Sequence, residues 1–265
     1  MPFENVNLIP IYLSFGIGAI LVVLALWKKV LTIPATCTAF IVLVLASLFT
    51  GYTGLTVFSV SFLFAAVIGL IKKEERKKVE EGRYPHEGAR SMVQVLANAL
   101  PALIYGAVYF ATGLHSFLIA SAVTVTAGIA DSVASDIGNL SKGKVVNILT
   151  FKKVERGMSG GVSLLGTLSA LVASTCVSAI VFAVGEVGIK GLWVMTLSGF
   201  LGTIVDSLLG ASVQRAYKCV QCGFITERKE HCNKPTELIK GLKFVDNNVV
   251  NVVSLIIAGA ISLIF

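Results

Sequence analysis

The positive charges of this chain are confined almost entirely to alternate gaps between long apolar segments. All Lys and Arg residues except Lys190 lie in four gaps, which follow residues 27, 71, 130 and 210. An α-helix needs about 20 apolar residues to cross a bilayer, and the segments are close to this length. Only 14% of the residues are charged, against roughly a quarter in soluble proteins. The pattern therefore predicts a polytopic membrane protein.

Eight apolar segments are predicted to span the membrane, which gives an all-α transmembrane bundle forming a single domain over residues 1–265. The segments are 8–27, 33–49, 55–71, 91–112, 114–130, 162–184, 192–210 and 249–265. The first has no basic stretch before it and has Lys28 and Lys29 after it, which indicates a membrane anchor and not a cleaved signal peptide. By the positive-inside rule the four cationic gaps face the cytoplasm, so both termini are expected on the other side.

Two of the cationic gaps are long enough to form cytoplasmic loops. Residues 72–90 alternate short blocks of Lys or Arg with Glu, which favours a solvated helix, with attraction to anionic headgroups as the alternative. Residues 215–245 contain a cluster with the composition of a zinc knuckle, made of Cys219, Cys222, His231 and Cys232. Thiolate and imidazole are ligands that Zn²⁺ prefers, so we expect either a structural zinc that supports folding or reduced, metal-free cysteines.

The first unusual motif, Asp131-Ser132 followed by Asp136, lies at the inner end of the fifth segment. An Asp near hydrocarbon is costly unless it is paired, protonated or bound to a metal. The two Asp residues lie about 140° apart on an ideal helix, so a kinked or broken helix is predicted to bring them together. Capping of a helix that leaves the membrane is the alternative interpretation.

A glycine-rich motif follows at residues 152–167. Glycines whose N–H groups can point inward, with cations before them and a helix start after them, predict a phosphate cradle, and small-residue helix packing is the alternative. The motif is not a Walker A loop, because no Gly-Lys-Ser/Thr closes it. The candidate binding residues are Lys152, Lys153, Arg156, Gly157, Ser159, Gly160, Gly161 and Ser163.

Two further polar motifs lie near the inner ends of the last two segments. Asp206-Ser207 repeats the Asp-Ser pair of residues 131–132, and the short similarity indicates a possible degenerate internal repeat. Asp246, Asn247 and Asn248 open the final segment, either as helix caps or as part of a polar site. All four motifs are predicted on the cytoplasmic side, which favours one shared site.

Carboxylate oxygens from these motifs suit Mg²⁺, which commonly shares a site with nucleotide phosphates. The candidate catalytic and magnesium-binding residues are Asp131, Asp136, Asp206 and Asp246. The cationic and glycine-rich residues, with Asn247 and Asn248, are the candidates for binding the cofactor. The set predicts a centre for phosphoryl or nucleotidyl transfer.

Four stretches of the chain resemble the integral-membrane family called domain of unknown function 92. They are residues 128–138 (Gly-Ile-Ala-Asp-Ser-Val-Ala-Ser-Asp-Ile-Gly), 160–167 (Gly-Gly-Val-Ser-Leu-Leu-Gly-Thr), 206–211 (Asp-Ser-Leu-Leu-Gly-Ala) and 246–248 (Asp-Asn-Asn). The family includes the plant phytyl-phosphate kinases and a mammalian transmembrane protein of less certain role.

The resemblance implies transfer of a phosphoryl group from a nucleoside triphosphate, with CTP favoured, to a membrane isoprenyl monophosphate such as phytyl or geranylgeranyl phosphate. The expected partners are the bilayer, the lipid substrate, the nucleotide and Mg²⁺, and no nucleic acid is expected. Two alternatives stay open. Intramembrane Asp residues on broken, repeated helices are also typical of transporters, and a lipid nucleotidyltransferase would use the same site chemistry. The sequence does not fix the lipid tail or the oligomeric state.

Overall fold

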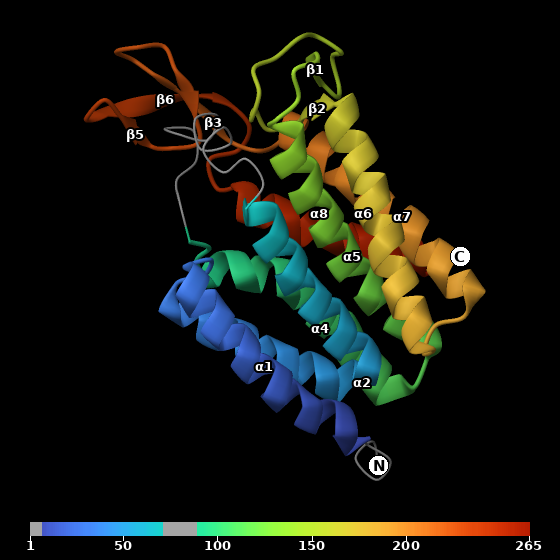
Figure 1. The fold of residues 1–265 in the computed structure, drawn as a ribbon. Coiled ribbons are helices and arrows are strands. Elements are labelled where there is room, and N and C mark those ends of the chain that lie inside the picture. The colour runs from blue at the N-terminus through green and yellow to red at the C-terminus, as the bar shows by residue number, and fades with distance from the viewer. Residues whose placement is uncertain (1–6, 71–88) are drawn as a thin grey trace.

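The computed structural model describes residues 7–70 and 89–265, and within them the chain forms a helical bundle with small sheets at one end (Figure 1). The predicted charged loop 72–90 lies outside these residues apart from Ala89 and Arg90. The helices are α1 (Leu8–Lys28), α2 (Ile33–Leu70), α4 (Met92–Thr112), α5 (His115–Gly138), α6 (Leu164–Val184), α7 (Ile189–Ser212) and α8 (Asn247–Ser262). Six of them are long and apolar enough to cross a membrane, so the multi-span prediction is confirmed for the described residues.

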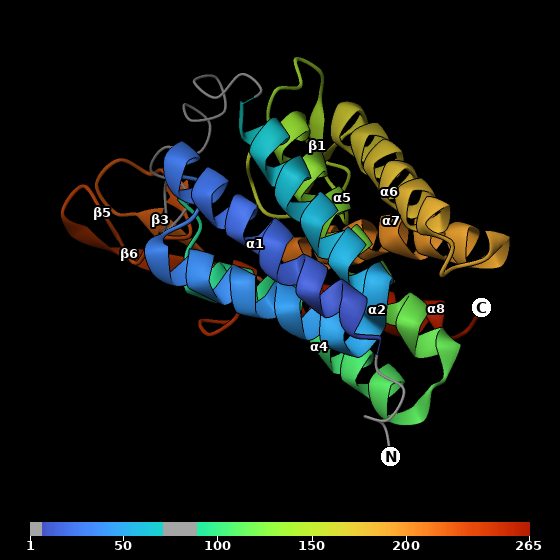
Figure 2. The same ribbon diagram turned by 60° about the horizontal axis from the view of Figure 1, so that its bottom comes forward.

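Helix α2 contains a break that divides it into two arms. Thr50 and Gly51 leave the helical conformation, and Gly51 has a φ of 60°, which a residue with a side chain rarely adopts. The arms meet in a V and run in opposite senses (Figures 1 and 2). The arms correspond to two of the eight predicted segments. Helix α8, at the last predicted segment, has 16 residues and is shorter than that segment. The count of eight spans therefore remains a prediction.

Glu186, in the connection between α6 and α7, stabilises the start of the second arm. Its carboxylate accepts hydrogen bonds from the backbone N–H groups of Tyr52 and Thr53 and from the Thr53 hydroxyl. The first N–H groups of a helix have no partner within the helix, so this carboxylate serves as the N-cap. His115, at the start of α5, contacts the carbonyl of Glu186 at 2.9 Å and links α5 to the same point.

Helix α5 forms the centre of the bundle, packing against α2, α4, α6, α7 and α8. Its buried face is built from small and β-branched residues, which let neighbouring backbones approach closely. Gly202 of α7 illustrates the tight fit, because a Cβ at this position would lie 2.7 Å from that of Ala127 and 2.9 Å from that of Ala258. The core is therefore arranged around the helix that carries Asp131 and Asp136.

The prediction of an all-α fold is wrong for two of the connections. Strands β1 (Val145–Asn147) and β2 (Gly161–Ser163) form an antiparallel pair. A second antiparallel sheet has the order β4-β3-β6-β5, with β3 (Ala216–Cys219), β4 (Ile225–Thr226), β5 (Glu230–His231) and β6 (Lys234–Lys240). Open sheet edges need water for their free backbone groups, so such strands suit connections outside the hydrocarbon region.

Both sheets lie at the same end of the bundle, which we call the sheet end (Figure 1). Here α5 and α7 finish and α6 and α8 begin. The connection after α1 is tied to the start of α4, because Arg90 donates its N–H to the Val30 carbonyl at 2.9 Å and accepts from the Thr32 N–H at 3.1 Å. Three of the cationic connections thus carry defined backbone or sheet structure.

The predicted internal repeat stays a prediction, but the lengths of four helices follow the same order twice. α4 and α6 each have 21 residues, and the helices that follow them, α5 and α7, each have 24. Asp131 and Asp206 lie near the carboxyl ends of the two 24-residue helices. The similarity of the two Asp-Ser pairs therefore extends to their positions in the fold.

Candidate functional site

A cavity of about 120 Å³ at the sheet end brings together residues from the predicted motifs, and we call it the polar cavity. It is formed by the ends of α5 and α7, the start of α6, and the connection that leads into β2. The predicted site residues that line it are Asp131, Arg156, Gly157, Ser159, Gly160, Gly161, Ser163, Asp206 and Asn247. Residues from all four sequence motifs therefore meet in one place.

The glycine-rich connection passes very close to α7. Gly157 and Gly160 have φ values of 75° and 79°, a conformation that favours glycine. A Cβ on Gly160 would collide with the backbone and side chain of Ala211, and a Cβ on Gly210 would lie 3.0 Å from the Gly160 nitrogen. Glycine is required at position 160 both by backbone conformation and by space.

The start of α6 forms another wall of this cavity. Ser163 is the N-cap of α6 and accepts a hydrogen bond from the Gly166 N–H at 3.2 Å. A helix N-terminus carries a partial positive charge from its unpaired N–H groups, which favours an anion. Together with Arg156, it gives the polar cavity a side suited to phosphate.

Two charged residues next to the four-stranded sheet hold the glycine-rich connection in position: Glu227, which is buried just after β4, and Lys240, which is half-buried at the end of β6. Glu227 accepts hydrogen bonds from the Ser159 hydroxyl at 2.7 Å and from the Gln214 amide at 2.8 Å. Lys240 donates to the Gly210 carbonyl at 2.8 Å and to the Ser159 carbonyl at 3.4 Å. Burial raises the pKa of Glu227 and lowers the pKa of Lys240. Sequence reasoning missed both, because nothing near either residue in the chain indicates its partner.

Asp131 and Asp206 supply the carboxylates of the polar cavity from two different helices. Asp206 accepts a hydrogen bond from Ser254 of α8 at 2.9 Å. Asp131 lies within electrostatic range of Asp206, Asp136 and Arg90. Two acidic groups that interact in this way repel each other unless a cation lies between or beside them. The donor set, carboxylate oxygens with a serine hydroxyl nearby, fits Mg²⁺.

Asp136 does not line the polar cavity but faces a second one. Helix α5 is continuous from His115 to Gly138, so the predicted kink or break between the two Asp residues is wrong. An unbroken helix keeps residues five apart on different faces. Asp131 and Ser135 thus line the polar cavity, whereas Ser132 and Asp136 line a cavity of about 140 Å³ between α1, α2, α4 and α5. We call this second space the apolar cavity, because most of its lining is aliphatic or aromatic.

The three predicted cations of the glycine-rich motif separate in the structure. Arg156 lines both the polar cavity and an open hollow of about 740 Å³ next to it, which Lys142 and Lys153 also line. Lys152 lines none of the described cavities, and its carbonyl accepts a hydrogen bond from the Asn147 N–H at 2.9 Å. Cationic side chains therefore extend from the open hollow to the polar cavity, and Arg156 lines both.

The motif at residues 246–248 is divided between capping and the cavity. Asp246 is the N-cap of α8, accepting from the N–H groups of Asn248 and Val249 at 3.0 and 3.1 Å, and it pairs with Arg215 at 3.4 Å. Asn247 lines the polar cavity, whereas the side chains of Asp246 and Asn248 are not among its lining. A catalytic or magnesium-binding role of Asp246 remains a prediction.

The predicted zinc ligands converge within the four-stranded sheet. The ligand atoms of Cys219, Cys222, His231 and Cys232 all lie within 4.8 Å of one another, and the sulfurs of Cys222 and Cys232 are 3.8 Å apart. In tetrahedral coordination, Zn–S bonds of about 2.3 Å place two sulfurs about 3.8 Å apart, so the cluster fits zinc. Adjacent His231 and Cys232 can both point inward because Cys232 has a φ of 54°.

The thiols of the cluster differ in acidity. The backbone hydrogen bond from Cys222 lowers the pKa of Cys219 to about 6. The side-chain hydrogen bond with Cys222 raises the pKa of Cys232 to about 11. One thiolate is therefore available at neutral pH even before a metal binds, and thiolate is the form that binds metal.

A series of polar contacts connects the two cavities through residues that the sequence analysis did not select. Asn98 of α4 lines the apolar cavity, and Asn251 of α8 contacts its side-chain oxygen at 3.5 Å. Ser254 donates both to the Asn251 carbonyl and to Asp206. The signal that could have revealed Asn98 is its place inside an apolar segment, where a polar side chain is costly and commonly functional.

Comparison with known proteins places the sequence in a family. The model of the integral membrane protein family DUF92 matches residues 16–259. Protein PGR of Arabidopsis thaliana is 29% identical over 239 residues, covering 75% of this chain and 76% of that protein. An uncharacterized membrane protein of Methanocaldococcus jannaschii is 31% identical over 154 residues, covering 56% of this chain and 58% of that protein.

A further relative has a more distant sequence. Protein VTE6, chloroplastic, of Arabidopsis thaliana is 26% identical over 136 residues, which cover 51% of this chain and 34% of that protein. No solved structure matches the chain. The family resemblance seen in the four motifs is confirmed by these comparisons.

Proposed function

The chain belongs to the DUF92 family of integral membrane proteins, and on this premise we propose that it is a kinase acting on a membrane isoprenyl monophosphate. The reaction transfers the terminal phosphoryl group of a nucleoside triphosphate to the lipid phosphate. One P–O bond forms between an oxygen of the lipid phosphate and the γ-phosphorus. The bond between the γ-phosphorus and the oxygen that bridges it to the β-phosphorus breaks. The products are an isoprenyl diphosphate and a nucleoside diphosphate.

One observation carries the proposal: the polar cavity combines two carboxylates with a phosphate-binding arrangement. Asp131 and Asp206 line the same space as Arg156 and the residue 157–161 connection. Phosphoryl-transfer sites commonly combine carboxylates that hold a divalent cation with backbone N–H groups and an arginine that face them. The family's plant phytyl-phosphate kinases supply the chemical class of the acceptor.

In this proposal each part of the polar cavity has a separate role. Arg156, with Lys153 in the open hollow, binds the triphosphate, and the Gly157–Gly161 backbone with the start of α6 orients its terminal phosphate. Asp131 and Asp206 would hold Mg²⁺, which would neutralise phosphate charge. No general base is required, because the attacking phosphate oxygen is already anionic near neutral pH.

The remaining elements of the proposal come from the sequence. The positive-inside rule assigns the sheet end to the cytoplasm, where nucleotides are available. CTP is favoured by the family resemblance, and phytyl and geranylgeranyl phosphate are the two acceptors considered. We also propose one structural zinc at Cys219, Cys222, His231 and Cys232, because the four donor atoms converge as Zn²⁺ requires.

The test is turnover by the purified protein. The protein in detergent is incubated with Mg²⁺, geranylgeranyl or phytyl monophosphate, and each labelled nucleoside triphosphate in turn. A lipid diphosphate together with a nucleoside diphosphate supports the kinase. Release of pyrophosphate would instead indicate a nucleotidyltransferase, and no turnover with any lipid would direct attention to transport.

A further inference from the structure

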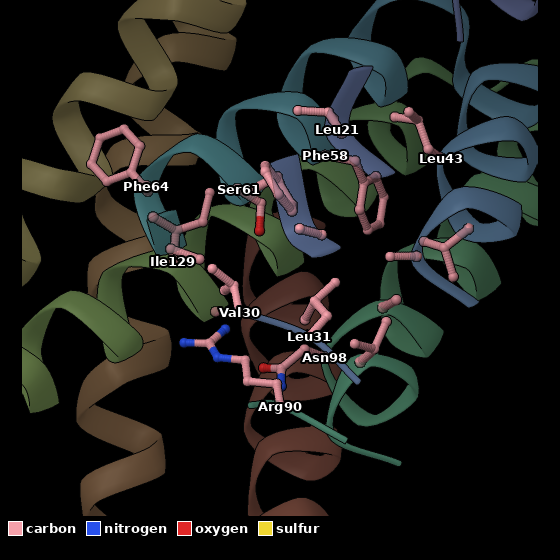
Figure 3. Close-up of a pocket in the computed structure, with 18 of the residues that line it drawn as sticks. Leu21, Val30, Leu31, Leu43, Phe58, Ser61, Phe64, Arg90, Asn98 and Ile129 are labelled. Atoms are coloured by element: carbon pink, nitrogen blue, oxygen red, sulfur yellow. The ribbon is translucent and has the colours of Figure 1, made fainter. Parts of the chain in front are cut away.

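The apolar cavity has the chemistry of a site for one end of an amphipathic lipid. Figure 3 shows Leu21, Phe58, Phe64 and Ile129 around the space, with the polar side chains of Arg90 and Asn98 together at one side. Ser132 and Asp136 of α5 add a hydroxyl and a carboxylate, and the rest of the lining is mostly aliphatic and aromatic groups from α1, α2, α4 and α5. A ligand that fills it therefore needs an apolar body and a polar or anionic head.

The polar side of this cavity is fixed by the backbone. The backbone N–H and carbonyl of Arg90 are hydrogen-bonded to Val30 and Thr32, and Arg90 immediately precedes Ser91, the N-cap of α4. Gln94 and Asn98 line the cavity one and two helical turns farther along α4. An arginine with amide neighbours provides donors for a phosphate, and arginine binds phosphate with two parallel N–H groups.

We propose that the apolar cavity binds the phosphate-proximal isoprene unit of an isoprenyl monophosphate, with the phosphate at Arg90. This inference rests on the proposed function, since it assigns the acceptor of that reaction. The volume of about 140 Å³ limits what can enter. An engineered protein cavity of about 150 Å³ holds one benzene molecule, so about one five-carbon unit fits here and the rest of the tail lies outside, in the lipid.

The size of the cavity determines which differences between lipids matter. Phytyl and geranylgeranyl phosphate have the same first isoprene unit, with its allylic double bond, and differ only farther along the chain. Their affinities are therefore expected to agree within about fivefold, which is less than 1 kcal/mol. Loss of the phosphate removes the contact with Arg90 and has a larger effect.

The proposed head position is coupled to the polar cavity through Asp131 and Asp206. Arg90 lines the apolar cavity and lies within electrostatic range of Asp131, which lines the polar one. Asn98 is connected to Asp206 through Asn251 and Ser254. A phosphate at Arg90 therefore lies beside the turn of α5 that separates the two cavities.

Lipid binding without nucleotide tests the inference independently of turnover. Tritiated geranylgeranyl monophosphate is titrated onto the protein in phosphatidylcholine nanodiscs. Ala65 lines the cavity and its neighbour Ala66 does not, so Ala65→Leu and Ala66→Leu form a matched pair. Ala65→Leu is expected to weaken binding at least tenfold and Ala66→Leu less than twofold. Equal affinities of the two variants would overturn the site.

The head group is tested with a second lipid. Arg90→Gln is expected to weaken geranylgeranyl monophosphate at least tenfold while changing the affinity for geranylgeraniol less than twofold. Equal losses for the phosphate and the alcohol would remove the phosphate from Arg90. If binding follows these expectations but no nucleotide supports turnover, the lipid site stands and the kinase proposal fails. If turnover occurs and Ala65→Leu leaves both binding and the lipid KM unchanged, the site fails alone.

A measurement on the unmutated protein covers the case in which Ala65→Leu does not fold. A geranyl monophosphate with a diazirine on its first isoprene unit is photolysed with the protein, and the labelled peptides are mapped. Labels in the second arm of α2, in α4 or in residues 125–136 of α5 support the inference. Labels confined to α6, α7 or α8 would overturn it.

Discussion

The two cavities on either side of α5 are similar in volume, about 120 and 140 Å³, but opposite in chemistry. The polar cavity is bounded by helix ends, a glycine-rich connection and a sheet. The apolar cavity is bounded by the sides of helices. Asp131 and Asp136 are five residues apart on the helix between them and face different cavities. A single continuous helix can therefore offer one carboxylate to each cavity, at a separation set by helical geometry.

The largest expected effect is confined to the polar cavity. Asp206→Asn should lower turnover at least about 10²-fold, because a contact to the metal or to the developing charge is lost. Binding of geranylgeranyl monophosphate without nucleotide should stay within twofold of the unmutated protein. Folding is checked by size-exclusion chromatography in detergent. Wild-type turnover in a folded Asp206→Asn variant would remove this residue from the site.

A smaller effect should distinguish the two substrates. Arg156→Ala is expected to raise the nucleotide KM about tenfold and the lipid KM less than twofold, since Arg156 lies between the open hollow and the polar cavity. Lys144→Ala removes an exposed cation that lines no described cavity and serves as the matched control. A rise confined to the lipid KM would mean that the assignments of the two cavities are reversed.

The zinc cluster should affect the polar cavity and not the apolar cavity. Cys219→Ser is expected to reduce zinc from about one ion per chain to near zero and to lower the melting temperature. In the remaining folded protein, a few-fold rise in nucleotide KM is expected, because the same sheet positions Ser159 through Glu227 and Lys240.

The control for this variant is Cys176→Ser, which changes an exposed cysteine outside the cluster. Zinc is measured by elemental analysis of protein purified without an affinity-metal column. Absence of zinc in the unmutated protein, with thiols that titrate freely in the native state, would refute the metal site. A loss of lipid binding in Cys219→Ser would contradict the separation of the two sides.

The smallest effect concerns the pH dependence of stability. Burial raises the pKa of Glu227, so the folded state holds its proton more tightly than the unfolded state does. The stabilising contribution of this proton is present below pH 4.5, the ordinary value, and is lost as pH rises through the raised pKa. Glu227→Gln keeps a hydrogen-bond acceptor for Ser159 and stays neutral. Its melting temperature should therefore fall less with rising pH, by a difference under about 4 °C.

Much of the polar cavity could be predicted from the sequence because its residues occur in short motifs whose composition is costly in a membrane. Asp131, Asp206 and the glycine-rich connection were selected in this way. Glu227 and Arg90 were not, because their roles depend on partners distant in the chain, Ser159 and the turn after α1. A short motif shows which functional groups are neighbours in the sequence. The contacts between distant connections depend on the fold.

The apolar cavity was harder to anticipate for a different reason. Apolar side chains that line a cavity have the same composition as those that face lipid or the core, so no pattern separates them. The opposite directions of Asp131 and Asp136 did follow from helical geometry, but the sequence interpretation favoured a broken helix. The convergence of His231 and Cys232 required the left-handed backbone at Cys232, which residue identity alone does not indicate.

The cap that Glu186 provides for the second arm of α2 sets a condition on the order in which the chain can be assembled. The N–H groups of Tyr52 and Thr53 acquire their side-chain acceptor from a residue more than 130 positions later in the sequence. During synthesis, the turn at Thr50 and Gly51 therefore enters the membrane before its partner exists. Until α6 has been inserted and Glu186 arrives, water or lipid headgroups must satisfy these backbone groups, which keeps the tip of the V at the membrane surface.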